Sequence, residues 1–355
     1  MKSITANSYS IHFNSTGYTY LNSHLEASNY SKIFVLVDQN THELCLAQFL
    51  SRLETQIDIE IIEIEAGEIN KNIETCSGVW GVLSELGADR KSVLINLGGG
   101  VITDLGGFVA STFKRGIDYI HVPTTLLAMV DAAIGGKTGV DLGHLKNQIG
   151  VVNPGKMVLI DTSFLTSLPQ NQMRSGLAEM LKHGLIYSEA YWNKFLKLDT
   201  LDVSDLDQLI YESIEIKTAI VEKDPFEKHI RKTLNYGHTI GHAIESYYLS
   251  NSNKTPLLHG EAIAIGMILA TYISTKLSGF SLMKCEHIKT VILEIFGQIK
   301  IEDEDRNPII ELLKFDKKNE HGNINFVLLE AIGKPRIDCL VENNVLLKAF
   351  NYYNS

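Results

Sequence analysis

Three histidines that lie close together in the sequence are candidates for binding a metal ion. His238 and His242 are four residues apart in a segment with helical spacing, so they share one helix face, and His259 follows after a polar loop. Three imidazoles, or two imidazoles and a carboxylate, with one open position form a catalytic zinc site. Thr239 stands where the H-E-x-x-H motif of zinc peptidases has glutamate, which disfavours a peptidase. A lone histidine is more often structural, so it is the clustering that favours a metal site.

Polar residues continue this spacing toward the N-terminus. Asn235 and Arg231 precede His238 at intervals of three and four, since 238 − 235 = 3 and 235 − 231 = 4. If residues 230–250 form one helix, a single face carries basic and metal-binding side chains within an otherwise apolar segment. Burying such a face is costly unless a ligand compensates the desolvation, so the pattern indicates a binding site.

Glycines that follow an apolar strand pattern indicate a nucleotide site. Residues 97–107 read LGGGVITDLGG, with three glycines between a predicted strand and a predicted helix, where the backbone can approach a phosphate closely. The G-x-G-x-x-G fingerprint is missing, so a tight turn is the alternative. Thr124 and Thr125 follow another strand and can hydrogen-bond phosphate or ribose. Asp38, with Asn40 just after it, can bind a ribose or simply cap a helix.

Several lysines are candidates for binding an anionic ligand. Lys137 follows two glycines, and Asp131, Lys146 and Asn147 lie nearby among small and apolar residues, although most lysines are simply exposed. Glu179 and Lys182, three residues apart, share a helix face, where a surface ion pair is the alternative. Lys317 and Lys318 lie in a charged loop that taken alone indicates no function.

The elements that must position these residues fall into two parts. Strand patterns at residues 32–37, 57–64, 92–97, 118–122 and 157–160 alternate with helical ones such as 71–86. This alternation predicts an α/β, Rossmann-like domain with a parallel sheet over residues 1–168. Residues 169–355 are predicted to form an all-α domain, with helices at 171–184, 205–223, 230–250, 260–276 and 284–296 and a strand pattern at 324–329.

Composition excludes some classes of protein. The 355 residues carry a net charge of −10, which argues against a general nucleic-acid binder. The four cysteines form no C-x-x-C pair, and the first residues lack an apolar signal core, so a cytoplasmic protein with no membrane partner is expected.

Taken together, these motifs resemble the 3-dehydroquinate synthases of the sugar phosphate cyclase superfamily. The resemblance covers residues 38–333 and rests on LGGGVITDLGGF, VPTTLLAMVDAAIGGKTGVD, LKNQIG, SGLAEMLKHG, LNYGHTIGHAIE, HGEAIAIGM and DKK, in the order and spacing of that family. It implies the dehydroquinate synthase-like fold, with NAD and Zn²⁺ or Co²⁺ as cofactors. Departures include Asp141, where the family commonly has asparagine, and Ala132-Ala133, where it commonly has two serines.

The resemblance also implies residue roles. The metal ligands would be Glu179, His238 and His259, which makes His242 a substrate-site residue. The cofactor-binding residues would be Asp38, Asn40, Glu68, Lys71, Gly99, Gly100, Asp104, Thr124, Thr125, Lys146 and Ser167. The catalytic residues would be Lys137, Lys182, Lys217, Arg231, Asn235 and His242. The substrate-binding residues would be Arg115, Asp131, Asn147 and one of Lys317 and Lys318. Arg115 resembles an arginine that reaches the phosphate pocket of a neighbouring subunit, which implies a homodimer.

The reaction implied is the second step of the shikimate pathway, in aromatic amino acid biosynthesis. A 3-deoxy-D-arabino-heptulosonate 7-phosphate is converted to 3-dehydroquinate and phosphate, through transient oxidation by NAD, phosphate elimination, re-reduction and aldol ring closure. Three alternatives remain: a related cyclase acting on a neutral sugar phosphate, a metal- and NAD-dependent polyol dehydrogenase, and a binding protein with a decayed site. The many basic groups favour the sugar-acid substrate, because a carboxylate must be neutralised in addition to the phosphate.

Overall fold

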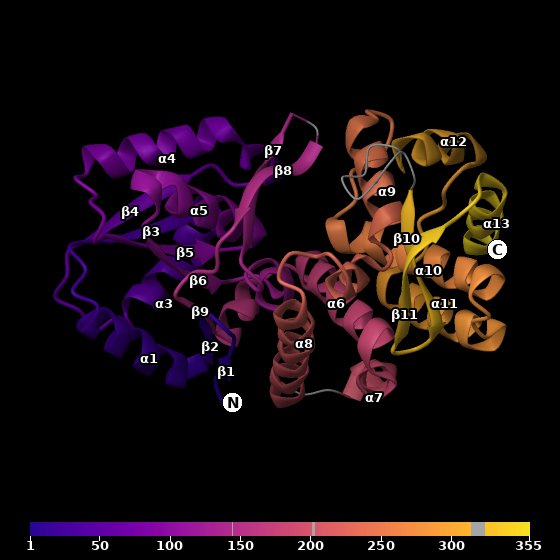
Figure 1. The fold of residues 1–355 in the computed structure, drawn as a ribbon, viewed down its shortest axis with the longest axis horizontal. Coiled ribbons are helices and arrows are strands. Elements are labelled where there is room, and N and C mark those ends of the chain that lie inside the picture. The colour runs from indigo at the N-terminus through magenta and orange to yellow at the C-terminus, as the bar shows by residue number, and fades with distance from the viewer. Residues whose placement is uncertain (144, 201–202, 314–323) are drawn as a thin grey trace. The chain divides into compact units, whose positions relative to one another are not determined.

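The structure is a computed structural model that describes residues 1–143, 145–200, 203–313 and 324–355 (Figure 1). Tertiary contacts divide the chain into two compact units, Met1–Pro169 and Gln170–Ser355. None of the helices among the described residues is long and apolar enough to cross a membrane.

The first unit is built on a seven-stranded sheet with the strand order β1-β2-β9-β6-β5-β3-β4. Its strands are β1 (Ile4–Thr5), β2 (Ser10–Phe13), β3 (Ile33–Asp38), β4 (Ile59–Ile64), β5 (Val93–Gly98), β6 (Asp118–Pro123) and β9 (Met157–Ile160). All neighbouring strands are parallel except β1 and β2. The predicted parallel-sheet α/β domain is therefore confirmed. The two N-terminal strands were not predicted, because they are short.

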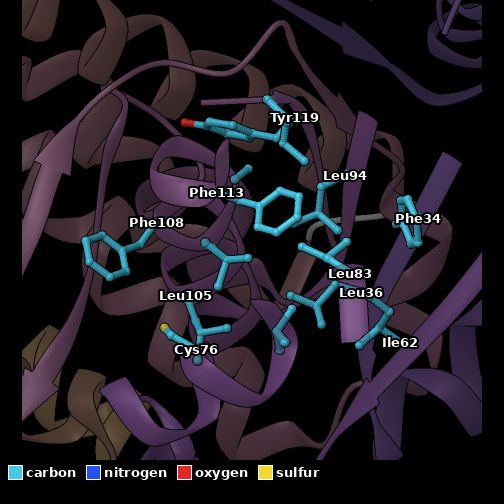
Figure 2. Close-up of a cluster of buried hydrophobic side chains, with 14 of the residues drawn as sticks. Phe34, Leu36, Ile62, Cys76, Leu83, Leu94, Leu105, Phe108, Phe113 and Tyr119 are labelled. Carbon is cyan, nitrogen blue, oxygen red and sulfur yellow. The ribbon is translucent and has the colours of Figure 1, made fainter. Parts of the chain in front are cut away.

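Helices cover both faces of this sheet. They include α1 (Asn14–Ala27), α2 (Gln39–Thr41), α3 (Ala47–Leu50), α4 (Ile73–Glu85) and α5 (Gly100–Thr112). In Figure 1, α4 and α5 lie on one side of the strands and α1 on the other. Between the sheet and α4 and α5 lies a cluster of buried apolar side chains that includes Phe34, Leu94 and Leu105 (Figure 2). Strands buried on both faces in this way read as continuous apolar runs, which is why their positions were predictable.

An antiparallel hairpin extends the first unit. It consists of β7 (Lys137–Leu142) and β8 (Leu145–Val152) and was not predicted, because glycines interrupt the sequence here. Gly139 pairs with Gly150, and a Cβ on Gly139 would lie 2.5 Å from the carbonyl oxygen of Ile149. The glycines thus allow a close approach of the two strands, which carry Lys137, Lys146 and Asn147.

The second unit is mainly helical. Its helices are α6 (Gln170–Tyr187), α7 (Glu189–Trp192), α8 (Val203–Lys223), α9 (His238–Ser250), α10 (His259–Leu277), α11 (Leu282–Phe296), α12 (Asp303–Leu312) and α13 (Asn343–Asn354). The buried helix α10 packs against α6, α9, α11 and α13. The unit also contains a hairpin of β10 (Asn325–Ala331) and β11 (Lys334–Leu340). The strand pattern at 324–329 anticipated β10, whereas β11 is an addition to the predicted all-α domain.

The predicted continuous helix over residues 230–250 is wrong. Residues Ile230–Asn235 form a separate 3₁₀ segment (η7), and α9 begins only at His238. Between them Gly237 adopts the left-handed conformation, with φ +77°, which ends one helical segment before the next starts. Arg231 and Asn235 therefore do not share a helix face with His238, and only the His238–His242 pair of that predicted stripe remains.

Candidate active site

Glycines bring the N-terminal halves of α9 and α10 close together. A Cβ on Gly266 of α10 would lie 2.0 Å from the carbonyl oxygen of Gly237, and one on Gly241 of α9 would lie 3.1 Å from that of Ala262. Both helices begin at a histidine, His238 in α9 and His259 in α10. Close packing of the two backbones therefore places these imidazoles next to each other, with ring centroids 5.6 Å apart.

Helix α6 approaches the start of α10 in the same way. The backbone N–H of Gly260 donates to Oγ of Ser175 at 2.9 Å, and a Cβ on Gly260 would lie 2.3 Å from the Cα of Ser175. One helical turn after Ser175, Glu179 points from α6 toward the histidines. Gly260, Gly266 and Ser175 were missed in the sequence analysis, although their clustering as small residues in helical segments could have signalled close packing.

The side chains of Glu179, His238 and His259 converge on one point. Oε1 of Glu179 lies 3.3 Å from Nε2 of His238 and 3.6 Å from Nε2 of His259. This oxygen is buried and has no hydrogen-bond partner among the described residues. Ligand atoms around a tetrahedral zinc ion, each about 2.1 Å from it, lie about 3.4 Å from one another. The distances between the three side chains and the buried oxygen without a hydrogen-bond partner are both consistent with a divalent metal site.

His242 is close enough to be an alternative ligand. The ligand atoms of His238, His242 and His259 all lie within 4.8 Å of one another. The sequence alone left open whether the third ligand is an imidazole or a carboxylate. Glu179, however, has a buried carboxylate oxygen without a hydrogen-bond partner among the described residues, which is costly unless a cation satisfies it. This observation favours Glu179.

Charge at this point is set by buried ionisable groups. The Lys182 ammonium contacts Oε2 of Glu179, and both side chains are almost completely buried. Burial acts to raise the pKa of Glu179, but Lys182 and His238 outweigh it and hold the pKa well below its usual value. Burial acts to lower the pKa of His259, but the carboxylates of Glu179 and Glu245 outweigh it and raise the pKa to about 9. The carboxylate of Glu179 is therefore kept ionised, and the imidazole of His259 holds its proton more tightly than a free imidazole.

A carboxylate organises the loop that carries Arg231. Asp224, buried at the end of α8, accepts hydrogen bonds from the backbone N–H groups of Lys228 at 3.0 Å, His229 at 2.6 Å and Arg231 at 3.1 Å. Burial acts to raise the pKa of Asp224, but these three donors outweigh it and lower the pKa. The guanidinium of Arg231 is buried and donates from Nη1 to the carbonyl oxygen of Pro225 at 2.6 Å. Asp224 was missed in the sequence analysis.

Asn235 lies against the same loop. Its side-chain amide donates to Oε1 of Glu227 at 2.6 Å. Glu227 has φ +57°, a left-handed conformation that is uncommon for a residue with a side chain. The loop thus brings one more carboxylate to the predicted site, and Glu227 was also missed. Only its position four residues before Arg231 could have drawn attention to it.

Replacing Asp224 with alanine is expected to loosen this loop. The backbone N–H groups of Lys228, His229 and Arg231 lose their acceptor, and for the buried Arg231 an unsatisfied N–H costs about 1–3 kcal/mol. Native-state hydrogen exchange at these three amides should become faster while the helices of the unit keep their protection. Glu222→Ala, which removes a nearby carboxylate that makes none of these bonds, serves as the control. Unchanged exchange in the Asp224 variant would contradict this account.

In the first unit, four residues predicted to bind the cofactor form one ionic cluster. Nζ of the buried Lys71 lies 2.8 Å from Glu68, 3.5 Å from Asp104 and 3.8 Å from Asp141, and Nζ of Lys146 lies 3.5 Å from Glu68. Burial acts to lower the pKa of Lys71, but the carboxylates outweigh it and raise the pKa. Burial raises the pKa of Asp104 to about 6, even though Lys71 acts to lower it. Asp141 is an additional member of this cluster.

Other predicted cofactor residues lie where adjacent parallel strands end. Asp38 ends β3, Gly99 and Gly100 follow β5, and Thr124 and Thr125 follow β6. The carboxyl ends of neighbouring parallel strands are the usual ligand-binding edge of an α/β sheet. Oδ1 of Asp38 accepts a hydrogen bond from the Thr41 N–H at 2.8 Å, so Asp38 does cap a helix, as the alternative interpretation predicted. The residue nevertheless lies at this edge of the sheet.

The remaining predicted residues are distributed over both units. Asn40 is exposed on α2, and Ser167 is exposed at the end of the 3₁₀ segment Thr162–Ser167. Asp131 lies on the π-helical turn Ala128–Ala132, and Lys217 is buried on α8. Arg115 is exposed at a bend where its own φ is +70°. Lys317 and Lys318 lie outside the described residues.

Comparison with known proteins agrees with this arrangement. The family model described as the 3-dehydroquinate synthase N-terminal domain matches residues 61–175, and the one described as its C-terminal domain matches residues 176–319. A 3-dehydroquinate synthase of Parabacteroides distasonis is 44% identical over 331 residues, which cover 93% of each chain. The chain belongs to the 3-dehydroquinate synthase family. The predicted family is thereby confirmed. A further member of the family, from Campylobacter jejuni subsp. doylei, is 38% identical over 86% of this chain and 88% of its own.

Solved structures of sugar phosphate cyclases share the fold. A 2-deoxy-scyllo-inosose synthase complexed with carbaglucose-6-phosphate, NAD⁺ and Co²⁺ is similar at a TM-score of 0.84 and 26% identity, covering 99% of both chains. A 2-epi-5-epi-valiolone synthase from Streptomyces hygroscopicus, with NAD⁺ and Zn²⁺ bound, reaches a TM-score of 0.84 at 23% identity over 99% of this chain and 98% of its own. The predicted dehydroquinate synthase-like fold is therefore confirmed.

Proposed function

We propose that this enzyme is a phosphate-eliminating lyase that converts 3-deoxy-D-arabino-heptulosonate 7-phosphate to 3-dehydroquinate, and its relatives named 3-dehydroquinate synthase support this proposal. The observation that carries the proposal is the convergence of Glu179, His238 and His259 on a point that fits a divalent metal. A buried carboxylate beside two imidazoles, with the buried Lys182 next to it, provides a centre for reactions at substrate hydroxyls.

The proposed metal ligands are Glu179, His238 and His259, and the metal is Zn²⁺ or Co²⁺. A metal bound there supplies Lewis acidity toward substrate hydroxyl groups. Lys182 neutralises part of the Glu179 charge and fixes the orientation of the carboxylate through its contact with Oε2. His242, whose ring centroid lies 5.2 Å from that of His238, is proposed to hydrogen-bond the substrate.

NAD is proposed as the cofactor of the first unit. Support comes from the glycine-rich start of α5, from Asp38 at the end of β3, and from the 26%-identical cyclase structure that contains NAD⁺. A helix N-terminus with small residues lets phosphate oxygens approach backbone N–H groups. The cluster around Lys71 is proposed to contact the same cofactor.

Basic and amide side chains of the second unit are proposed to hold the substrate's anionic groups. Arg231 and Lys217 are buried, and a buried cation favours an anionic partner because charge-assisted hydrogen bonds are strong. The loop around Asp224 fixes the backbone of Arg231. The hydrogen bond to Glu227 orients Asn235. Lys137, Asp131, Asn147, Lys317 and Lys318 remain proposed contacts of the substrate.

Two further proposals concern the protein as a whole. A homodimer is proposed because Arg115 is exposed at a left-handed bend, where its guanidinium has no hydrogen-bond or ion-pair partner among the described residues and is available to a second copy of the chain. A cytoplasmic location is proposed because all four cysteines are free and buried, as is usual in a reducing compartment.

The test is phosphate release from 3-deoxy-D-arabino-heptulosonate 7-phosphate by purified enzyme with catalytic NAD and zinc, with NADH absorbance followed in parallel. We expect many phosphates per NAD, no net NADH, and loss of activity after EDTA treatment that added Zn²⁺ or Co²⁺ restores. Activity on glucose 6-phosphate or sedoheptulose 7-phosphate instead would assign the chain to a cyclase of neutral sugar phosphates. Net NADH formation from a polyol would assign it to the dehydrogenases.

A further inference from the structure

A buried carboxylate outside the proposed ligand set lies against one of the proposed metal-binding imidazoles. Glu245 is on α9, seven residues after His238, and is 5% exposed. Its Oε2 lies 3.4 Å from Nδ1 of His259, while Nε2 of the same ring lies 3.6 Å from Oε1 of Glu179. The imidazole of His259 is therefore held between two carboxylates, one at each nitrogen.

The partner of Nδ1 decides which ring nitrogen is available to a metal. A histidine that binds a metal through Nε2 carries its proton on Nδ1, and an acceptor at Nδ1 fixes this tautomer and the direction of the ring. For His238 the acceptor is the backbone carbonyl oxygen of Tyr236, 3.1 Å from Nδ1. For His259 it is the Glu245 carboxylate, which also makes the ring a stronger donor to a cation.

We propose that Glu245 is a positioning residue of the metal site. It holds the proton of His259 on Nδ1 and directs Nε2 toward Glu179, without being a ligand itself. Because α9 carries both Glu245 and His238, this helix supplies one proposed ligand and orients the imidazole of another, His259, on α10. This inference rests on the proposed metal site of Glu179, His238 and His259.

Two substitutions separate the charge of Glu245 from its ability to accept a hydrogen bond. Glu245→Gln keeps an acceptor of the same shape without the charge, and Glu245→Met removes both. Outer-shell partners of metal-binding histidines typically contribute about 10–100-fold to metal affinity, so we expect about 10-fold weaker Zn²⁺ binding for the glutamine variant and about 100-fold for the methionine variant. Affinity is measured on metal-free protein by competition with a chromophoric chelator, and the visible absorption spectrum of the Co²⁺ form should shift.

A control separates positioning from loss of stability. Asp305 is a buried carboxylate of the same unit that accepts hydrogen bonds from Tyr247 at 2.7 Å and Lys254 at 2.7 Å. Asp305→Asn should lower the thermal midpoint but leave the Zn²⁺ affinity and the Co²⁺ spectrum of the folded protein unchanged.

The outcomes are distinguishable. Failure of the wild-type protein to bind Zn²⁺ would refute the proposed metal site as a whole. If the wild-type protein binds Zn²⁺ and Glu245→Gln matches its affinity and Co²⁺ spectrum, the positioning role is overturned. If Glu245→Met does not fold, the glutamine variant decides the question alone.

Discussion

Replacing Glu179 with glutamine is expected to abolish catalysis and to weaken Zn²⁺ binding by more than about 100-fold, beyond the usual range for outer-shell partners. The variant keeps the shape of the side chain but loses the charge at Oε1, which lies 3.3 Å and 3.6 Å from the two imidazoles. It also leaves the ammonium of Lys182, which is 1% exposed, without its counter-charge. Breaking a buried ion pair in this way costs about 3–5 kcal/mol. Metal affinity and urea unfolding of the metal-free protein measure the two effects separately.

A double variant separates the stability effect from the metal effect. Glu179→Gln combined with Lys182→Met removes both charges, so most of the lost free energy of unfolding should return, whereas Zn²⁺ binding should not. His242→Gln tests the alternative ligand set and should keep near-native Zn²⁺ affinity. If the glutamine variant at position 179 binds Zn²⁺ normally and the His242 variant does not, the three histidines are the ligands and the assignment of Glu179 is wrong.

Strands β3, β5, β6 and β9 of the first unit were predictable because burial on both faces leaves a clear signal. Residues 157–160 were predicted as a strand, and β9 spans Met157–Ile160. The His238–His242 pair was recognisable for a similar reason, because helical periodicity is local. The hairpin of β7 and β8 was not predictable, since its glycines are explained only by the close approach of Gly139 and Gly150.

The details of the site depend on contacts that a local pattern does not contain. The spacing of residues along the sequence does not indicate whether Glu179 or His242 is the third ligand, because Glu179 lies on a different helix. The break at Gly237 was missed because the left-handed conformation there is tied to the packing of α9 against Met267 in α10. Asp224 contacts backbone groups four to seven residues away, and Glu245 contacts His259 fourteen residues away, so both become interpretable only once the loops and helices are placed.

Replacing Gly266 with alanine is expected to disrupt the proposed metal site, although Gly266 is not one of its proposed ligands. The added methyl group would lie 2.0 Å from the carbonyl oxygen of Gly237 and 2.9 Å from the backbone nitrogen of Gly241, and neither backbone atom can rotate away as a flexible side chain would. Overpacking a core typically costs about 1–3 kcal/mol, and a clash with backbone atoms should exceed that range. Helices α9 and α10 must then separate, which moves His238 away from His259. We expect a thermal midpoint lower by about 6–12 °C, the shift that about 3 kcal/mol produces in a unit of this size, together with a loss of Zn²⁺ affinity.

Gly81→Ala provides the matched control for this substitution. Gly81 lies within α4, and a Cβ there would meet no heavy atom within 4 Å. Alanine is favoured over glycine by about 0.5–1 kcal/mol inside a helix, so this variant should be slightly stabilised and bind Zn²⁺ as the wild-type protein does. If Gly266→Ala keeps both the midpoint and the Zn²⁺ affinity, close packing of α9 against α10 is not what holds the two histidines together. A lower midpoint with unchanged affinity would show that the packing contributes to stability while the histidines are positioned by their own hydrogen bonds, through Tyr236 and Glu245.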